Sequence, residues 1–418
     1  MKIGYLIPEW PGQTHVWAWR EICHLRELGL DVTILSTRRP AHATRGKHEF
    51  TAAAEAETFY LVPLRWQDII QELVWAIAHC PGQLLACIRL GLTLPVYQKP
   101  NLRSVLPLLI PALQLAHTLR RHQIEHLHTP MPANSAILCM MAKQLTQVPY
   151  SLTLCAPVNH WGGAMREKIL GAEFVTVVAS WMLEQVQQTC PDLPADRLSM
   201  TRHGVDPHKW VPVPQELKQA DAPTRLVSIG RLAPCKGFDV LLKAIALVKQ
   251  QGLALDLHIA GEGNERPVLE QLVRDLHLEE EVTFLGSVSE DRCLAEMQAA
   301  DMFVLASHQE PLGVVYLEAM AVEVATVGTR AGGVVDMIVD GETGVLVPPG
   351  DVEALAGAIA RLIQNPALRD RLGKAGRQAV LSQFDSRIGA AKLRDLLVHS
   401  TDDLTNLEES ALSSSCPV

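Results

Sequence analysis

The sequence has no uninterrupted apolar run of the ~18 to 20 residues that a membrane-spanning helix needs, no CxxC pair and no Asp-x-Asp. Its nine cysteines are scattered and odd in number, which is typical of reduced cytosolic thiols and disfavours a disulfide framework or a zinc site. Positive charge is also scarce: 37 Lys and Arg face 46 Asp and Glu, a net charge of −9. This balance disfavours a nucleic-acid-binding protein, which would need a basic surface.

The N-terminal residues MKIGYLIPEW lack the basic start, the apolar run and the small-residue cleavage site of a secretory signal. They predict a buried strand that leads into a proline-rich loop, and we expect a cytoplasmic protein. The stretch 69–119 is strongly apolar but is broken by prolines, among them Pro81, Pro95, Pro107 and Pro111. Two interpretations of it stay open: packed helices of the first domain, or a peripheral contact with the inner face of a membrane that carries a lipid-linked acceptor.

Short apolar runs alternate with longer helical patterns, which is typical of βα units around parallel sheets. The length of 418 residues suits two domains of ordinary size. We therefore predict an α/β fold in which two Rossmann-like domains face a central cleft. The expected parts are a first domain at 1–206, a proline-containing linker at 207–223, a second domain at 224–385, a helix at 386–399 that crosses back to the first domain, and a disordered tail at 400–418.

The segment from Glu310 to Glu318 places two carboxylates eight positions apart, after an apolar strand. Gly313 permits a tight turn, and the residues after it begin a helix. The first N–H groups of a helix have no intrahelical acceptor and lie at its positive end, so they can receive a phosphate. Carboxylates suit sugar or ribose hydroxyls. On spacing alone, two solvated glutamates beside a helix start remain the alternative.

A second constellation is Gly230-Arg231-Leu-Ala-Pro-Cys-Lys236-Gly237, with two cations that follow a strand. A planar guanidinium and a mobile ammonium can grip a diphosphate without a metal ion, and each charge-assisted hydrogen bond contributes ~1.5–3 kcal/mol. Two solvent-facing loop cations are the alternative.

These motifs occur together with Thr329-Arg-Ala-Gly-Gly333 and with Asp340-Gly-Glu-Thr-Gly-Val-Leu-Val-Pro-Pro-Gly350. In this order and spacing they resemble the donor domain of retaining family 4 glycosyltransferases, which have the GT-B fold. The resemblance is specific over about 225–385. It is weaker in the first domain, where the Pro8–Thr14 loop is similar to the subgroup that builds exopolysaccharides and colanic-acid-like polymers.

The resemblance implies a retaining enzyme that needs no metal or other cofactor, with a nucleotide-diphosphate-sugar as donor and a glycan or lipid-linked molecule as acceptor. Arg231 and Lys236 would hold the diphosphate, Glu310 the sugar hydroxyls and Glu318 the ribose. The implied donor contacts also include backbone groups and loops in both domains, at Gly12, Gln13, Gly230, Gly286, Val288, Gly313, Val314 and Val315.

One position departs from the family pattern. At the end of the Tyr150–Leu154 strand stands Cys155, where relatives usually place a His that contacts the donor sugar. A neutral thiol is the weaker hydrogen-bonding partner. A catalytically impaired nucleotide-sugar-binding or assembly protein of the same fold is therefore the alternative function.

Three further features have two interpretations each. His128, in the pair His126-Leu-His128, could line the cleft or be a satisfied core histidine. His160 could substitute for the missing His or lie on the surface. Gly261-Glu-Gly263 is similar to a dinucleotide fingerprint, but Arg266 occupies the third glycine position, which disfavours a Rossmann oxidoreductase.

Overall fold

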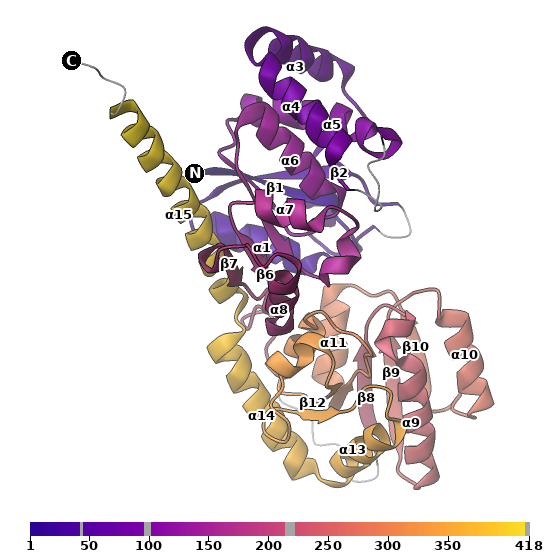
Figure 1. Ribbon diagram of the computed structural model, residues 1–418. Coiled ribbons are helices and arrows are strands. Elements are labelled where there is room, and N and C mark those ends of the chain that lie inside the picture. The colour runs from indigo at the N-terminus through magenta and orange to yellow at the C-terminus, as the bar shows by residue number, and fades with distance from the viewer. Residues whose placement is uncertain (42–44, 96–101, 214–221, 414–418) are drawn as a thin grey trace. The chain divides into compact units, whose positions relative to one another are not determined.

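The computed structural model describes residues 1–41, 45–95, 102–213 and 222–413. The chain divides into two compact units, Met1–Arg202 together with Gly389–Val418, and His203–Ile388. Each unit is built on one parallel sheet with helices packed against it (Figure 1). The predicted α/β class with two parallel-sheet domains is confirmed, while the cleft between them stays a prediction.

The sheet of the first unit has seven strands in the order β3-β2-β1-β4-β5-β6-β7, and all neighbours are parallel. Its strands are β1 (Lys2–Glu9), β2 (Asp31–Arg38), β3 (Phe59–Tyr60), β4 (His126–Thr129), β5 (Tyr150–Leu154), β6 (Val175–Val177) and β7 (Leu198–Met200). Its helices are α1 (Val16–Glu27), α2 (Thr51–Glu57), α3 (Trp66–His79), α4 (Pro81–Thr93), α5 (Leu102–His122), α6 (Asn134–Thr146), α7 (Met165–Gly171) and α8 (Ser180–Thr189).

The core of the first unit forms where one face of β1 meets apolar helix residues. Ile3 and Ile7 are fully buried in one cluster with Ile22 of α1 and with Leu393 and Leu397 of the C-terminal helix α15 (Ser386–Ser413). Full burial of such a side chain contributes about 1.5–3 kcal/mol. Apolar packing thus places a segment from the end of the chain in the first unit.

The sheet of the second unit has six parallel strands in the order β10-β9-β8-β11-β12-β13. Its strands are β8 (Thr224–Ile229), β9 (Leu255–Ala260), β10 (Val282–Gly286), β11 (Met302–Val304), β12 (Ala325–Thr329) and β13 (Val345–Val347). Its helices are α9 (Phe238–Gln250), α10 (Arg266–Asp275), α11 (Glu290–Ala299), α12 (Val314–Ala321), α13 (Val352–Gln364) and α14 (Pro366–Gln383).

The chain segments at the unit boundaries differ from the sequence-based interpretation. His203–Asp206, expected in the first domain, belong to the second unit. Part of the predicted linker is packed, since Trp210 is fully buried and its carbonyl accepts a hydrogen bond from Arg377 Nη1 at 3.1 Å. Residues 214–221 of that linker lie outside the described residues.

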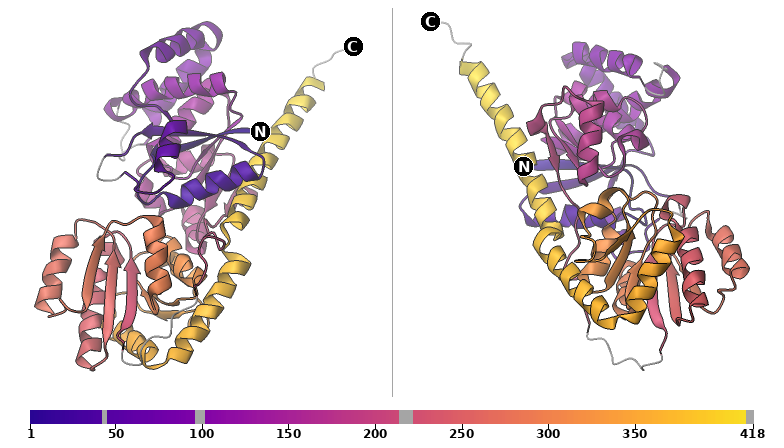
Figure 2. Two further views of the ribbon diagram at one scale, coloured as in Figure 1. Left: turned by 180° about the vertical axis from the view of Figure 1, so that it is seen from behind. Right: turned by 60° about the horizontal axis from the view of Figure 1, so that its bottom comes forward.

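The C-terminal helix is longer than predicted. The structure has helix through Ser413, where a disordered tail was expected from residue 400, and residues 414–418 lie outside the described part. Figure 2 shows α15 as one continuous helix, in yellow. The tail is poor in aromatics but contains Leu, Glu and Ala, which have high helix propensity. The expectation of disorder rests on polarity and low aromatic content, which do not include this propensity.

Candidate active site

The carboxyl edge of the second sheet carries most of the predicted site residues. Because the strands are parallel, the loops that follow β8, β9, β10, β11 and β12 all leave from this edge. Ligands of open α/β sheets bind at the carboxyl ends of the strands. The chain order therefore brings Arg231, Lys236, Gly286 and Glu310 to one edge.

Two of these loops are held together by main-chain contacts. The loop after β8 ends in a short helical turn, Pro234–Lys236, and the Cys235 carbonyl accepts hydrogen bonds from His308 N at 2.8 Å and Gln309 N at 3.3 Å. Gly237 has a φ of 65°, and a Cβ there would lie 2.0 Å from the Ala306 carbonyl oxygen. Only glycine permits this approach. The backbone thus fixes where Lys236 stands relative to the loop that carries Glu310.

Lys236 and Glu310 form a direct ion pair. The Lys236 Nζ lies 2.5 Å from Glu310 Oε2, and Ser307 Oγ donates to the same oxygen at 3.2 Å. The two side chains are 17% and 6% exposed, so the pair is largely removed from water. Glu310 Oε1 accepts no hydrogen bond from the described residues. One carboxylate oxygen is therefore occupied by protein groups and the other is available to a hydroxyl.

The main chain around Glu310 is fixed as well. Its carbonyl accepts from Gly333 N at 2.9 Å, and Thr329 Oγ1 donates to the Ser307 carbonyl at 2.5 Å. The motif Thr329–Gly333, singled out in the sequence, thus supports the loop after β11. Ser307 is not among the site residues predicted from the sequence. Its hydroxyl stands three positions before the Glu310 carboxylate, a spacing that could have indicated the contact.

Gly313 begins α12 in a conformation that suits glycine. Its φ is 92°, and a Cβ there would lie 2.8 Å from the Tyr316 ring and 2.9 Å from Glu310 Cγ. Tyr316 is fully buried and its hydroxyl donates to the Leu305 carbonyl at 2.8 Å, which ties the first turn to the end of β11. The N–H groups of Val314 and Val315 stand in this first turn and can receive an anion.

Glu318 lies one turn further along α12 and is partly buried. Burial raises the pKa of Cys293 on the neighbouring α11 to about 12, and Glu318, Glu290 and Glu296 add to this shift. Glu318 is thus a negative group close to α11. The structure places both carboxylates of the Glu-x7-Glu motif in one unit, with Glu310 in the loop before α12 and Glu318 within the helix.

The loops after β8, β9 and β10 approach one another closely. A Cβ on Gly261 would lie 1.8 Å from the Gly230 carbonyl oxygen, and one on Gly263 would lie 2.1 Å from the Leu232 carbonyl oxygen. Gly261 N donates to the Gly286 carbonyl at 2.8 Å. The Gly-x-Gly triplet therefore serves backbone packing beneath Arg231, not dinucleotide binding by a complete fingerprint.

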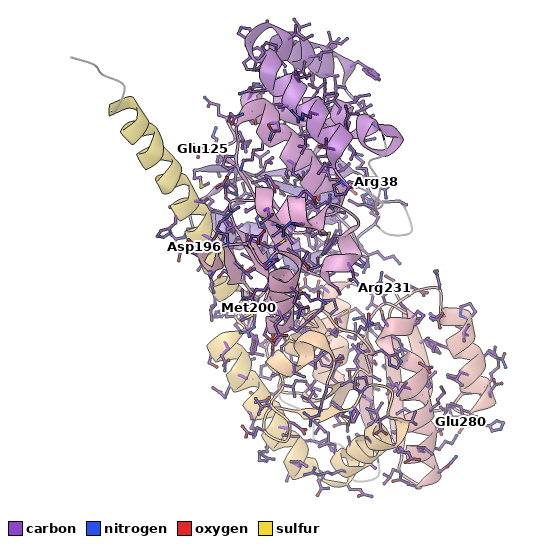
Figure 3. All side chains as sticks on the ribbon, viewed as in Figure 1. Arg38, Glu125, Asp196, Met200, Arg231 and Glu280 are labelled. Carbon is purple, nitrogen blue, oxygen red and sulfur yellow. The ribbon has the colours of Figure 1, made fainter. Side chains whose placement is uncertain are left out.

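Arg231 extends from this packed loop (Figure 3). It is exposed and forms no ion pair within the described part of the chain. Its loop is fixed by Leu232 N, which donates to the Glu262 carbonyl at 2.9 Å. Val288 follows Gly286, whose φ is 72°, on the next loop of this edge. A free guanidinium at the carboxyl edge is suited to an incoming phosphate.

The Gly12–Thr14 loop follows β1 in the first unit. Gly12 N donates to His15 Nδ1 at 3.0 Å, and Gln13 Oε1 accepts from Lys47 N at 2.9 Å. Burial lowers the pKa of His15 to about 4, so this ring is neutral and can accept the Gly12 hydrogen bond near pH 7. The loop is thus held by its own neighbours in a defined conformation.

Cys155 stands at the end of β5 and its Sγ donates to the Pro130 carbonyl at 3.0 Å. Burial, with a smaller contribution from Glu21, raises the pKa of the thiol well above its usual value, so it is neutral. Glu21 accepts from the Tyr5 hydroxyl at 2.6 Å, and burial raises the pKa of Glu21 to about 7. No local pattern in the sequence reveals this Tyr5–Glu21 pair, whose members are 16 positions apart.

His128 is a core residue. It is fully buried, its Nδ1 lies 2.9 Å from Ser151 Oγ, and its Nε2 lies 3.1 Å from Thr153 Oγ1. Burial lowers its pKa to about 3, which keeps the ring neutral. His160 is exposed beside Trp161 on a short helical turn. The structure favours the satisfied-core interpretation for His128 and the surface interpretation for His160.

No group of three or more His, Cys, Asp or Glu side chains has an arrangement that could hold a metal ion among residues 1–41, 45–95, 102–213 and 222–413.

Comparison with known proteins shows which sequences and folds the chain is similar to. Residues 213–379 match the family model described as glycosyl transferases group 1. A glycogen synthase of Mycobacterium tuberculosis is 29% identical over 279 residues, which cover 63% of this chain and 66% of that protein. The amylovoran biosynthesis glycosyltransferase AmsK of Erwinia amylovora is 30% identical over 226 residues, 52% of this chain and 54% of AmsK.

These matches to curated relatives thus span between about half and two thirds of the relatives' length. Solved structures extend the likeness in fold. Anabaena Alr3699/HepE in complex with UDP and glucose has a TM-score of 0.71 at 18% identity, covering 96% of this chain and all of that one. A sucrose-phosphate synthase from Thermosynechococcus elongatus has a TM-score of 0.70 at 20% identity, covering 96% of this chain and all of that one. These likenesses in fold confirm the predicted GT-B fold.

Proposed function

We propose that this chain is a retaining glycosyltransferase that moves a sugar from a nucleotide-diphosphate-sugar to a glycan or lipid-linked acceptor. The observation that carries the proposal is the Lys236–Glu310 pair beside the N-terminus of α12. An ammonium, a carboxylate with one available oxygen and a helix start occur together, and each suits a different part of a nucleotide sugar.

The donor roles follow from this chemistry. Lys236, the exposed Arg231 and the N–H groups of Val314 and Val315 bind the diphosphate. Glu310 Oε1 accepts from hydroxyls of the transferred sugar, while Lys236 holds Oε2 in place. Glu318 accepts from the ribose. The loop at Gly286–Val288 lines the base, and we include Gly12 and Gln13 among the residues proposed to bind the donor.

The chemistry we propose needs no metal ion. The bond between the anomeric carbon and the phosphate oxygen breaks, and its electron pair leaves with the diphosphate. The acceptor hydroxyl attacks the same face of the sugar and gives its proton to the departing phosphate. Lys236, Arg231 and the helix start stabilise the negative charge that develops, and such preorganised groups account for about 10²- to 10³-fold in rate each.

Names of relatives support the acceptor class. AmsK is named for amylovoran biosynthesis, and LpsE of Rhizobium meliloti, 37% identical over 165 residues, is named for lipopolysaccharide core biosynthesis. We include polysaccharide assembly in the proposal, at the cytoplasmic side of a membrane.

A donor-hydrolysis screen tests the proposal. The full chain is incubated with UDP-, GDP- and ADP-sugars, with and without a chelator, and release of the nucleoside diphosphate is followed. We expect one donor to turn over equally in both conditions, and Glu310→Ala to lower that turnover by orders of magnitude. Turnover that requires metal would refute the metal-independent step, and no turnover of any donor would refute the transferase.

Cys155 supports a second candidate, a nucleotide-sugar-binding or assembly protein with impaired catalysis. The thiol is neutral and its proton is directed to the Pro130 carbonyl, so it offers no donor hydrogen bond to a sugar. Replacing it by Cys155→His separates the two candidates. A rise of more than about tenfold in turnover, 1.36 kcal/mol in barrier, would favour the impaired protein.

A further inference from the structure

The outward face of α3 is apolar. Trp66, Ile70, Val74 and Ile77 are each 57% to 61% exposed, and Leu73 lies among them. At 3.6 residues per turn these positions fall on one face of the helix, whereas the buried residues Ile69, Glu72 and Ala76 fall on the next face, against α5. A solvent-facing helix surface normally carries polar side chains. This face has the composition of a buried one without being buried.

The neighbouring helix α4 continues this feature. Leu85 and Leu92 are exposed and lie seven positions apart, with Arg89 between them on the same face. Figure 1 shows α3, α4 and α5 packed side by side at one end of the first unit. We call the exposed apolar residues of α3 and α4 the α3–α4 face. Exposed apolar side chains on successive turns of two adjacent helices are more concentrated than the single ones usual on a soluble domain.

Each of the two helices is shorter than the hydrocarbon core of a bilayer. They have 14 and 13 residues, or about 20 Å each at 1.5 Å per residue, against a hydrocarbon core of about 30 Å. No single described helix meets the length and hydropathy needed to cross a membrane, but these two meet it jointly and are bent by 117° at their break. Such short, bent apolar helices fit the interface plane.

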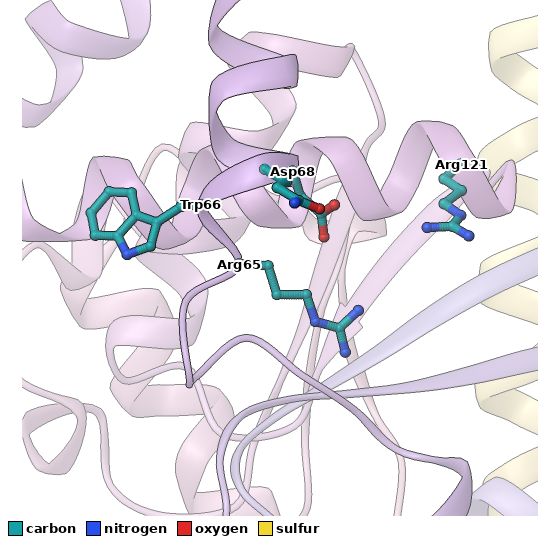
Figure 4. Close-up of a pocket in the computed structure, with 5 residues that line it drawn as sticks. Arg65, Trp66, Asp68 and Arg121 are labelled. Carbon is teal, nitrogen blue, oxygen red and sulfur yellow. The ribbon is translucent and has the colours of Figure 1, made fainter.

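Cations border this face. A hollow of ≈ 390 Å³ at the start of α3 is lined by Arg65, Trp66, Gln67, Asp68 and Arg121. Figure 4 shows Trp66 pointing away from the guanidinium groups of Arg65 and Arg121. Residues 61–122 carry six Lys and Arg against two Asp and Glu, a net +4 in a chain of net −9. Tryptophan beside arginine is typical of proteins that sit at the headgroup level.

From these observations we propose that the α3–α4 face docks on the surface of a bilayer containing anionic lipid, with Trp66, Ile70, Val74 and Ile77 below the headgroups and Arg65 and Arg121 against lipid phosphates. A second copy of the chain is the less suitable occupant, because a twofold contact would bring two net-positive segments together. The proposal rests on the proposed function only in that docking would bring the enzyme to a lipid-linked acceptor.

Vesicle flotation of the full chain tests the proposal. The probes are vesicles of equal parts phosphatidylglycerol and phosphatidylcholine, and vesicles of phosphatidylcholine alone. We expect the chain to bind the anionic vesicles about tenfold more strongly or better, with binding that weakens as salt is added. The double variant Ile70→Glu with Val74→Glu should lose at least about tenfold in partitioning.

The control is Val268→Glu on α10, which places one such carboxylate at a residue 60% exposed in the second unit and should leave partitioning within about twofold. Arg65→Gln with Arg121→Gln should reduce the preference for anionic vesicles while retaining binding to neutral ones.

Absence of flotation by the unmodified chain would overturn the proposal, as would equal binding by the Ile70→Glu, Val74→Glu variant. A concentration-dependent dimer that this variant dissociates, measured by light scattering, would assign the face to a second copy instead. Donor hydrolysis without vesicles is followed in parallel. Absence of hydrolysis in the unmodified chain and in every variant refutes the transferase, whereas normal hydrolysis without flotation refutes the docking surface alone.

Discussion

Lys236→Ala is the most informative single substitution, because one side chain joins both halves of the proposed site. It removes the ammonium that lies 2.5 Å from Glu310 Oε2 and leaves the carboxylate with the Ser307 hydroxyl as its remaining side-chain donor. The backbone need not move, since Gly237 and Cys235 hold the loop through main-chain contacts. The variant thus tests the charge and not the fold.

Two effects of Lys236→Ala can be estimated. Losing one preorganised cation at the departing diphosphate should lower kcat/KM about 10²- to 10³-fold, or about 2.7–4 kcal/mol in transition-state stabilisation. Breaking a buried ion pair costs about 3–5 kcal/mol in unfolding free energy. Here we expect about 1–3 kcal/mol, because the Lys236 side chain keeps 17% exposure and Ser307 still donates to Glu310.

The assay combines donor turnover with urea unfolding. Lys243→Ala is the matched control: it breaks an exposed pair with Asp239 at 2.9 Å on α9 of the same unit. It should change the unfolding free energy by less than about 0.5 kcal/mol and leave turnover unchanged. Adding Glu310→Gln to Lys236→Ala removes the unpaired carboxylate, and should restore part of the stability without restoring turnover. A folded Lys236→Ala protein that keeps more than a tenth of normal kcat/KM would refute the assigned role.

Three further substitutions test other parts of the account. Gly237→Ala should lower the unfolding free energy by more than about 2 kcal/mol, because the residue has a left-handed φ and its Cβ would lie 2.0 Å from a carbonyl oxygen. Gly252→Ala, at a φ of 77° with open space around it, should lower it by about 1 kcal/mol. Equal losses of the two variants in urea unfolding would contradict the close loop contact at Gly237. Burial raises the pKa of Glu21 from 4.5 to about 7, so the unfolded chain releases this proton at a lower pH than the folded protein and the free energy of unfolding falls as the pH rises from 4.5 to 7. Between pH 4.5 and pH 8 the unfolding free energy of the Glu21→Gln variant should therefore rise by about 3 kcal/mol relative to that of the unmodified protein. The same pH dependence of unfolding free energy in both proteins would contradict the raised pKa. Glu318→Ala should raise the KM for the donor about tenfold or more with kcat little changed, as expected for ribose binding, and steady-state kinetics showing a lower kcat at constant KM would assign it another role.

The glycines show what the sequence could and could not reveal. Gly313 was readable as a turn before a helix, and it begins α12 with a φ of 92°. The local pattern at Gly261 and Gly263 is similar to a dinucleotide fingerprint. In the structure, glycine is required at both positions because the carbonyls of Gly230 and Leu232 pack directly against them. The close partner of a glycine lies about 30 positions away in the chain, and no local pattern identifies it.

Histidine and apolar patterns were ambiguous for a similar reason. A His-x-His pattern on a strand is compatible with a cleft-lining position or with a buried one. His128 is a core residue because both of its ring nitrogens are hydrogen-bonded to the hydroxyls of Ser151 and Thr153 on the neighbouring strand. The sequence of α3 is apolar on two faces, so periodicity could not say which of them packs on α5. Only the packed helices show that Ile70 and Val74 face outward.

The sequence by itself determined the alternation of strands and helices, and with it the parallel sheets and the loops at their carboxyl edges, because apolar periodicity and turn residues act locally. It also brought Arg231, Lys236 and Glu310 to one edge, since every strand of a parallel sheet ends on the same side. The tertiary structure decided that Lys236 and Glu310 bond directly across 74 positions, and that an apolar face of α3 is left exposed. Contacts between distant segments depend on packing, which no short stretch of sequence contains.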